Sequence, residues 1–227
     1  GVAVICDDEE VQKTYMLSDY VTQQTNSKWF GARVPLKIYM LSGTDTTKRS
    51  CRFWRQLGEA PVLYDSVKSE RTMSDIQKVL SNAGFMKAEV EEFKIENGKK
   101  LKVLYNVHPK ERYTIRHIQR IVEDKGLRHF LTVEDTMNSL LKIGLPFEVN
   151  TMNGERNRIA TYLRNHGYYK FTKEDVQFSA DPARNSTEVD ITMRVKLHLD
   201  NGRTEATEHK QYTIGSVNFL TDITNPN

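Results

Sequence analysis

The stretch from Gly154 to Phe171 constrains the fold more than any other part of the sequence, because it holds a helix, the end of that helix and strand-like residues. Ile159 and Leu163 lie one helical turn apart, and polar residues fill most positions around them, which is typical of a helix with one buried stripe. Gly167 follows, and glycine ends a helix without a steric penalty. The aromatic residues that come next favour an extended strand. The stretch therefore predicts a helix that packs on a sheet.

The same pattern occurs earlier in the chain. Four residues at one spacing correspond to four others 83 positions later: Ile76, Leu80, Gly84 and Phe85 match Ile159, Leu163, Gly167 and Tyr168. A second repeated motif is the tripeptide Tyr-Thr-Ile, which occurs at residues 113–115 and again at 212–214. Such repetition indicates stacked units of one kind. We expect a first domain over residues 1–110, a second over 111–210, and the first strand of a third, truncated unit over 211–227, as in a piece of a longer array.

Length and composition agree with two modest domains. A chain of 227 residues has room for two domains of about 100 residues each, and 38% hydrophobic with 28% charged residues is a globular composition. The net charge of +3 is too small to indicate nucleic-acid binding by itself. No run of apolar residues is long enough to span a bilayer, and the first residues do not have the pattern of a secretion signal. Cys6 and Cys51 are expected to be thiols rather than a disulfide framework.

Periodicity predicts the elements of the first unit. A short apolar strand at residues 2–5 precedes an expected helix over 11–24, and acidic residues at 7–10 suit the positive end of its dipole. Thr72 with Asp75 has the spacing of a capping box, which predicts a helix over 74–83. Strict alternation on both sides of Asn97-Gly98 predicts a β-hairpin with a tight turn. Residues 25–71 are too long for an ordinary connection and are expected to be an insertion.

The second unit repeats this plan. We expect a strand over 113–122 and a helix over 133–143, with Thr132 and Asp135 as its capping box. Gly144 and Pro146 end that helix before the helix of the repeat, and a strand with strict alternation runs over 189–199. The predicted class is α+β: tandem units, each strand-helix-helix-strand-strand, with two helices packed on a three-stranded sheet.

The motif around the repeated helix resembles the polypeptide-transport-associated (POTRA) domain. It comprises Gly144-Leu145-Pro146-Phe147, Glu155-Arg156, Arg158-Ile159, Leu163 and Gly167-Tyr168-Tyr169. The Tyr-x-Ile openings at Tyr113 and Tyr212 resemble the start of successive POTRA units. The family comprises the domains that precede the membrane barrel in outer-membrane assembly and translocation factors of the BamA and TamA type.

The resemblance implies a non-enzymatic scaffold without a cofactor, in the periplasm of a Gram-negative bacterium. It implies partners that are unfolded outer-membrane proteins or accessory lipoproteins, and a C-terminal membrane barrel in the full-length protein. It also implies binding by strand addition at the second strand of each unit, here residues 87–95 and 175–180. The candidate contact residues there are Lys87, Glu89, Glu91, Phe93, Asp175, Gln177 and Ser179. The alternative is that charges such as Glu89, Glu91 and Glu92, or the nearby Pro182, protect these edges from pairing.

The insertion has its own composition. Between Lys28 and Arg55 it carries seven basic residues and one acidic residue, about +6. Aromatic residues interleaved with arginine are typical of interfaces, with a partner protein or with acidic lipid headgroups. The candidates are Trp29, Phe30, Arg33, Arg52, Trp54 and Arg55. The helical spacing of Phe53, Trp54 and Leu57 before Gly58 nevertheless favours a simpler interpretation, in which these residues pack on the first unit.

The search for chemistry in the sequence finds no catalytic or metal site. The six histidines lack metal-ligand spacing, and no nucleophile motif is present. No small-molecule substrate is therefore expected. A single-stranded nucleic-acid-binding module remains an alternative, since the sheets carry aromatic residues and the pI is near 8.7; an enzyme of unrecognised type is a further one. Nucleic acid is not expected, because the positive charge is scattered.

Overall fold

The computed structural model describes residues 1–43, 47–199 and 205–218. The chain divides into two compact units, Gly1–Arg112 and Tyr113–Asn227. The division falls between two neighbouring residues with different environments. The Arg112 side chain donates to the Ala83 carbonyl oxygen in the first unit, at 2.9 Å, while Tyr113 is buried in the second.

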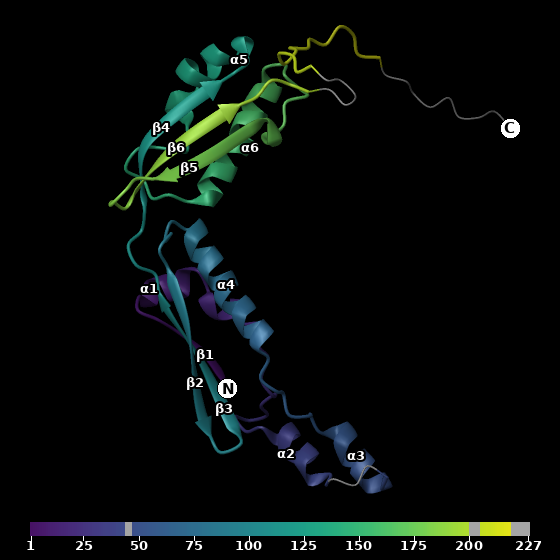
Figure 1. The fold of residues 1–227 in the computed structure, drawn as a ribbon. Helices are drawn as coiled ribbons and strands as arrows, with labels where there is room; N and C mark the ends of the chain where they lie inside the picture. Colours follow the sequence, from purple (N-terminus) through teal and green to yellow (C-terminus); the bar gives the residue numbers. More distant parts are fainter. Residues whose placement is uncertain (44–46, 200–204, 219–227) are drawn as a thin grey trace, which may run out of the picture. The chain divides into compact units, whose positions relative to one another are not determined.

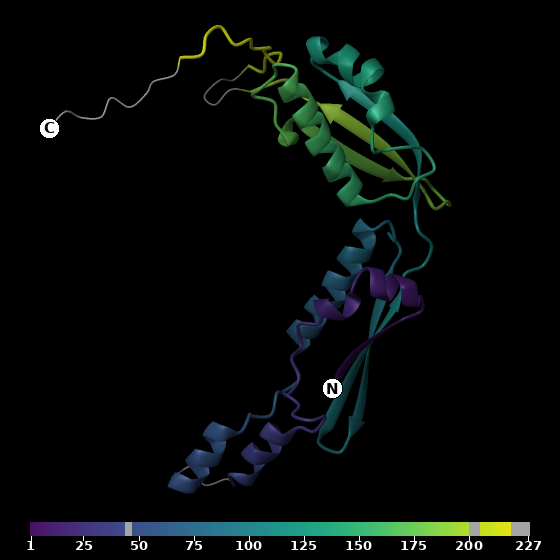
Figure 2. The same ribbon diagram turned by 180° about the vertical axis from the view of Figure 1, so that it is seen from behind.

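The first unit is a three-stranded sheet with the helices Glu9–Thr14 and Ser66–Asn82 on one face (Figures 1 and 2). Its elements in chain order are β1 (Val2–Cys6), α1 (Glu9–Thr14), the 3₁₀ turn η1 (Leu17–Tyr20), α2 (Val34–Leu41), α3 (Arg49–Leu57), α4 (Ser66–Asn82), β2 (Glu89–Asn97) and β3 (Lys100–His108). The strand order is β1-β3-β2. The central strand β3 is parallel to β1 and antiparallel to β2.

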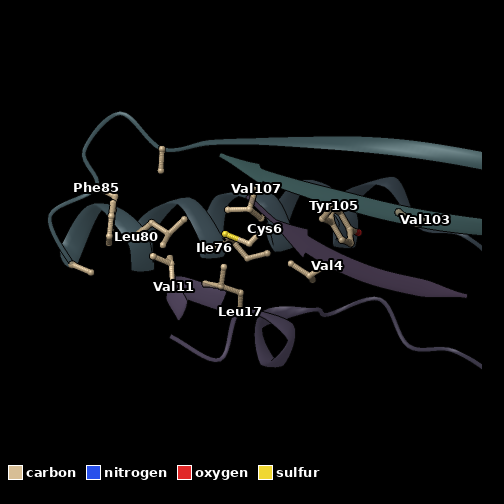
Figure 3. Close-up of a cluster of buried hydrophobic side chains, with 12 residues drawn as sticks. Val4, Cys6, Val11, Leu17, Ile76, Leu80, Phe85, Val103, Tyr105 and Val107 are labelled. Carbon is tan, nitrogen blue, oxygen red and sulfur yellow. The ribbon is translucent and has the colours of Figure 1, made fainter. Parts of the chain in front are cut away.

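The core of the first unit lies between α4 and the inner face of the sheet (Figure 3). Alternate residues of β1 and β3 point inward, among them Val4, Cys6 and Val107, and meet Ile76 and Leu80 of α4. Burial raises the pKa of the Cys6 thiol. Cys6 and Cys51, both within the described residues, form no disulfide. The apolar stripe predicted for this helix is therefore the one that forms the core.

Three local predictions for this unit are wrong at their boundaries. Helix α4 begins at Ser66, where the Asp65 carboxylate accepts hydrogen bonds from two backbone N–H groups of the first turn. Thr72 lies inside the helix, and its hydroxyl bonds to the Lys68 carbonyl oxygen. The helix expected over 11–24 is interrupted at Met16, which has a φ of 47°. The hairpin is present, but Asn97 pairs with Lys100, so the turn residues are Gly98 and Lys99, with Gly98 at a φ of 59°.

The second unit repeats the plan with a different first helix. Its elements are β4 (Thr114–Val122), α5 (Lys125–His129), the π-helical turn η2 (Phe130–Glu134), η3 (Thr136–Asn138), α6 (Val149–Asn165), η4 (Lys173–Asp175), β5 (Val176–Pro182) and β6 (Glu188–Val195). The strand order is β4-β6-β5, and the helices lie on one face of the sheet in both views (Figures 1 and 2). The predicted α+β class, with helices on three-stranded sheets, is confirmed.

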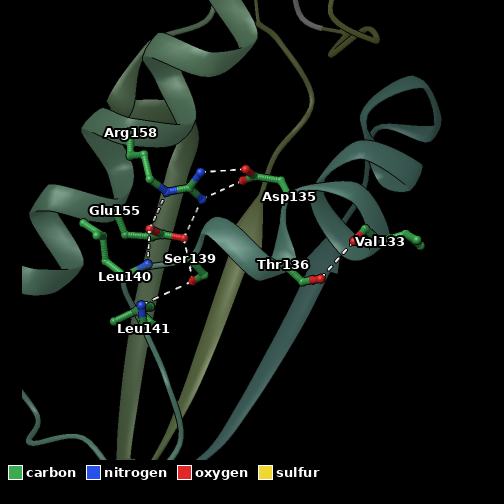
Figure 4. Close-up of polar contacts among 8 residues, drawn as sticks. All are labelled: Val133, Asp135, Thr136, Ser139, Leu140, Leu141, Glu155 and Arg158. Atoms are coloured by element: carbon green, nitrogen blue, oxygen red, sulfur yellow. Dashed lines mark hydrogen bonds and ion pairs between the residues drawn. The ribbon is translucent and has the colours of Figure 1, made fainter.

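The helix expected over 133–143 is wrong in position. The helical segment starts at Lys125, capped by the Asp124 carboxylate, and ends at Asn138. Asp135 is no capping residue, because its two oxygens accept hydrogen bonds from the Arg158 guanidinium of α6, both at 2.6 Å (Figure 4). Arg158 also binds the buried Glu155, whose other acceptor sites take the Ser139 hydroxyl and the Leu140 N–H. This network ties the irregular segment before α6 to the helix.

Two further differences concern the end of the second unit. Strand β6 ends at Val195 rather than at Leu199, and His198 forms an isolated bridge with Thr207 instead. Residues 211–218 are not paired in a sheet, and 219–227 lie outside the described residues, so the third unit stays a prediction. In the described part of the chain, none of the helices has both the length and the apolar character needed to cross a bilayer.

Candidate functional site

The two strands selected from the sequence, β2 and β5, are both edge strands of their sheets. Glu89, Glu91 and Phe93 lie on β2, and Gln177 and Ser179 lie on β5. Lys87 lies in the turn before β2. Asp175 lies in η4, where its carboxylate accepts from Thr172 and closes a capping box. An edge strand offers alternate N–H and C=O groups that no partner strand occupies.

The β2 edge adjoins an apolar patch on the face of the first sheet that no helix covers. We call this the open-face patch and define it as Ile5, Phe93, Ile95 and Leu104. Phe93 lies opposite Leu104, and Ile5 and Ile95 lie opposite Asn106 and Lys102 of β3. The side chains of Ile5, Phe93 and Ile95 are each about half exposed. The unpaired edge of β2 and this apolar surface therefore lie side by side.

The acidic residues of β2 block this edge less than their number indicates. Glu92 points to the inner face and accepts hydrogen bonds from the Ser69 and Tyr64 hydroxyls, at 2.6 and 3.0 Å. Burial opposes its charge, but these bonds and Lys94 outweigh burial and lower the pKa of Glu92. Glu89 pairs with Lys110 at 2.9 Å, at the start of the strand. Glu92 thus supports the core of the unit. On the open face Phe93 and Ile95 follow the exposed Glu91, which is an acidic residue on the same face beside the open-face patch.

The β5 edge has a different character. Its outward residues Gln177, Ser179 and Asp181 lie opposite Arg194, Thr192 and Asp190 of β6, so this open face is polar. Asp190 is already paired with Arg116, at 2.6 Å. The strand is seven residues long and ends at Pro182, and a proline limits pairing at an edge. Of the two predicted edges, β2 is the longer and the more apolar.

The outer edge of β4 is partly covered by the segment 144–147. Gly144 donates its N–H to the Ile115 carbonyl oxygen, and the Ile115 N–H donates to the Leu145 carbonyl oxygen, at 2.7 and 2.9 Å. Phe147 donates to the Tyr113 carbonyl oxygen, and its side chain is buried. This accounts for the Gly-Leu-Pro-Phe motif: Gly144 has a φ of 83°, and the turn that it permits lays the segment along β4.

The insertion presents two exposed aromatic residues on a tight turn. Trp29 and Ala32 exchange both backbone hydrogen bonds, at 2.8 and 3.0 Å, and Phe30 and Gly31 form the turn with φ values of 50° and 80°. Phe30 is fully exposed. A bulky residue at positive φ is a strained choice, and such outliers are found at functional positions. The turn therefore holds Phe30 out in water at a conformational cost.

The helices of the insertion leave most of their apolar residues exposed. Helices α2 and α3 pack on each other, and the Arg55 guanidinium lies 5.7 Å from the Tyr39 ring centroid. None of the nine residues of α3, all of which the structure describes, is buried. Phe53, Trp54 and Leu57 are all exposed, so their expected packing on the first unit is wrong. Arg33 precedes α2, and Arg52 lies on α3 beside these residues.

The structure also brings together polar residues that the sequence did not connect. Among the described residues, Asp175, His198 and His209 place one potential ligand atom each within 4.8 Å of one another. They come from η4, from the segment after β6 and from the segment after Thr207, so no sequence spacing links them. The Arg158, Asp135 and Glu155 network was likewise missed, although two of its members belong to the recognised motif.

Each unit thus has the strand order, the helical layer and the open second strand that the resemblance to POTRA domains predicts. The chain is similar to the solved structure of BamA POTRA domains 3 to 5 from Haemophilus influenzae, with 17% identity, 92% of this chain and 78% of that one covered, and a TM-score of 0.43. The chain is also similar to POTRA domains 1 to 3 of the periplasmic domain of Omp85 from Anabaena, with 14% identity, 86% of this chain and 63% of that one covered, and a TM-score of 0.31. A third similar structure is BamA from Haemophilus ducreyi lacking POTRA domains 1 to 3, with 17% identity, 68% of this chain and 27% of that one covered, and a TM-score of 0.35.

The predicted resemblance is therefore met by solved structures of POTRA domains. No family model and no curated protein matches the sequence. At these identities and TM-scores the likeness carries no statement about function.

Proposed function

We propose that this chain is the POTRA scaffold region of an outer-membrane protein assembly or translocation factor, in the periplasm of a Gram-negative bacterium. It binds unfolded outer-membrane proteins, or accessory lipoproteins, by strand addition. The observation that carries the proposal is the open β2 edge, nine residues long, beside the open-face patch. Backbone hydrogen bonds make such binding tolerant of client sequence, and the patch selects for apolar side chains.

The chemistry of the client follows from this surface. A transmembrane β-strand alternates apolar and polar residues, so a strand added to β2 would turn one row of side chains toward the open-face patch. Its apolar row fits beside Phe93 and Ile95, and its polar row fits the other side. The second edge, β5, offers the same backbone groups with a polar face. We therefore propose β2 as the main site and β5 as a weaker one.

Two neighbouring proline substitutions test this site. In an antiparallel edge strand, the N–H groups of consecutive residues alternate between the partner strand and the open side. One of Phe93→Pro and Lys94→Pro therefore removes a bond to β3 and lowers stability, while the other removes only an edge donor. Binding is measured by fluorescence anisotropy with a labelled peptide of about ten residues and alternating hydrophobicity. We expect the folded variant to bind at least tenfold more weakly than the unsubstituted chain.

Two controls separate the alternatives. Ala180→Pro makes the corresponding change on β5 and is expected to have the smaller effect, because bonds from Lys196 to Asp175 and from Ala183 to Glu188 show that the odd-numbered residues of β5 pair with β6. A peptide with methylated backbone nitrogens at alternate residues should lose binding if the ladder carries the affinity. Unchanged affinity in the folded β2 variant would reject strand addition at β2. Affinity for a single-stranded oligonucleotide that exceeds peptide affinity and falls steeply with salt would favour the nucleic-acid alternative instead.

A further inference from the structure

His209 is the unusual residue of the second unit, because its imidazole is buried and one ring nitrogen has no hydrogen-bond partner among the described residues. The side chain is 2% exposed. Its Nδ1 lies 2.9 Å from the carboxylate of Asp124, which is fully buried, and the His209 N–H donates to the same oxygen at 2.6 Å. The Nε2 atom is buried without a hydrogen-bond partner among the described residues. A buried polar atom left in this way costs free energy unless something binds it.

Two further side chains near Nε2 could act as metal ligands. The nearest carboxylate oxygen of Asp175 lies 3.9 Å away, too far for a hydrogen bond. The His198 ring centroid lies 5.4 Å from that of His209. A cavity of about 50 Å³ is lined by both histidines, with Tyr168 and Phe171 among its other residues, and this exceeds the volume that one water requires. The two imidazoles therefore line a small cavity, and a ligand atom of Asp175 lies within 4.8 Å of one on each of them.

We propose that Asp175, His198 and His209 form a binding site for a divalent transition-metal ion, with Zn²⁺ as the best fit. Two imidazoles and one carboxylate are a donor set that zinc accepts, and a water would complete a tetrahedron. In such a site neighbouring ligand atoms are roughly 3.4 Å apart, given metal–ligand distances of about 2.0–2.2 Å. The present separations, up to 4.8 Å, would close by small rotations of the three side chains.

The position of Asp124 supports this assignment independently. Metal-binding histidines usually donate the ring N–H that does not face the metal to a carboxylate, which fixes the tautomer and orients the ring. The Asp124 carboxylate holds Nδ1 in this way, and its other oxygen caps α5 through the Leu127 N–H. The Nε2 lone pair is then directed to Asp175 and His198. The bound ion would join the start of β5, the end of β6 and the segment around His209.

The test uses the full chain without a histidine tag, titrated calorimetrically with ZnCl₂ and, as a control, MgCl₂. We expect one zinc per chain, a higher melting temperature with zinc than with EDTA, and no effect of magnesium. His198→Gln should weaken zinc binding at least tenfold. Asp175→Asn should also weaken zinc binding. The asparagine amide oxygen can still accept the hydrogen bonds from Thr172, so the local fold is retained. His129→Gln removes an exposed histidine of the same unit and should leave zinc binding unchanged.

A spectroscopic readout excludes a merely structural effect. Cobalt bound in place of zinc should give visible absorption typical of a tetrahedral site, and this absorption should be lost in His198→Gln. The ¹⁵N resonance of His209 Nε2 should shift on addition of zinc. The proposal is overturned if no zinc binds at 1 mM, or if His198→Gln binds as tightly as the unsubstituted chain. It is also overturned if the melting temperature depends on pH, through protonation of His209, in the same way with zinc as with EDTA.

Discussion

At the scale of single residues, Gly167 shows how one position joins backbone conformation to packing. It ends α6 with a φ of 91°, as the sequence pattern predicted. A Cβ atom at this position would lie 2.8 Å from the Tyr212 carbonyl oxygen, and the Tyr212 N–H donates to the Gly167 carbonyl oxygen at 2.8 Å. The absence of a side chain is thus required by the backbone conformation and also by the segment that lies against it.

Gly167→Ala should therefore cost about 2 kcal/mol or more of unfolding free energy, and the β-branched Gly167→Val should cost more than the alanine variant. Gly144→Ala is the matched control, because Gly144 also has a positive φ but no atom would lie near the added Cβ. We expect about 1–2 kcal/mol there. Urea denaturation of the three variants measures the difference. Equal losses for the two alanine variants would mean that residues 211–212 move away without cost.

Arg158 is the second residue with a large predicted role. Its guanidinium bonds to the buried carboxylates of Asp135 and Glu155, so Arg158→Met leaves two buried charges without their cation. We expect a loss of about 3–5 kcal/mol at pH 7. Arg156→Met is the control on the same helix, since Arg156 stacks over Phe178 and its bond within the described part of the chain goes to Asn153. It should cost about 1 kcal/mol.

The pH dependence of this loss has a defined sign. Burial opposes the charge of Glu155, but hydrogen bonds from Arg158, Leu140 and Ser139 outweigh burial, and the pKa of Glu155 is lowered. Its contribution to stability is present above the unfolded pKa, about 4.3, and is lost as the pH falls through the folded pKa. The difference between wild type and Arg158→Met should therefore be constant from pH 7 to about pH 5, and should shrink as the pH falls below about 4.3. A difference that does not change with pH would contradict this account.

At the scale of elements, the sequence correctly predicted those helices and strands that are determined by local residue patterns. The apolar stripes of α4 and α6, the hairpin and the edge position of β2 and β5 follow from periodicity and from the resemblance. The start of α4 was wrong because Thr-x-x-Asp also occurs inside a helix, where Thr72 bonds to Lys68 and to Thr22. The helix over 133–143 was wrong because Asp135 has its partner on α6, and no local pattern reveals such a partner.

Contacts between residues far apart in the sequence also limit how much of the candidate sites could be predicted. Alternation along β2 is enough to place Phe93 and Ile95 on one face, and the composition of the insertion indicates its exposed aromatic residues. The cluster of Asp175, His198 and His209 depends on three segments that meet only in the folded unit. Histidine spacing along the chain therefore carried no signal of it.

The insertion yields a prediction about its indoles. Trp29 and Trp54 are about half exposed, so tryptophan emission should be shifted to the red in the free protein. If the insertion binds acidic headgroups, anionic vesicles should shift the emission to the blue, and salt should weaken this response. Phe30→Ser should reduce binding without loss of stability, because Phe30 contributes no buried surface. Emission that does not respond to vesicles or to a protein partner would remove the insertion from the candidate sites.

At the scale of the whole molecule, the chain consists of two units with separate cores. The first core and the second core have no residue in common, and the division lies at one peptide bond, between Arg112 and Tyr113. We expect residues 1–112 and 113–227 to fold when expressed separately. Circular dichroism of each fragment should show a cooperative thermal transition. A fragment that stays unfolded at all temperatures would mean that its partner is required for folding.

The first unit is closed at the base of its insertion by two side-chain amides. The Asn26 amide donates to the Ala60 carbonyl oxygen and accepts from the Val62 N–H, at 2.7 and 3.1 Å. The Gln23 side chain accepts from the Asp65 N–H at 2.9 Å. The chain that leaves the unit before Ser27 and the chain that returns after Glu59 are thus held together by residues that belong to neither helix of the insertion.

This closure has an evolutionary consequence. Because the two ends already meet, the residues between them span no fixed distance, and each doubling of their number costs only about 0.6 kcal/mol of closure free energy. Relatives of this chain could exchange, shorten or lengthen the segment between Ser27 and Gly58 while the sheet and α4 stay unchanged. Positions 23 and 26 would then vary less among such relatives than the aromatic and basic residues that the segment carries.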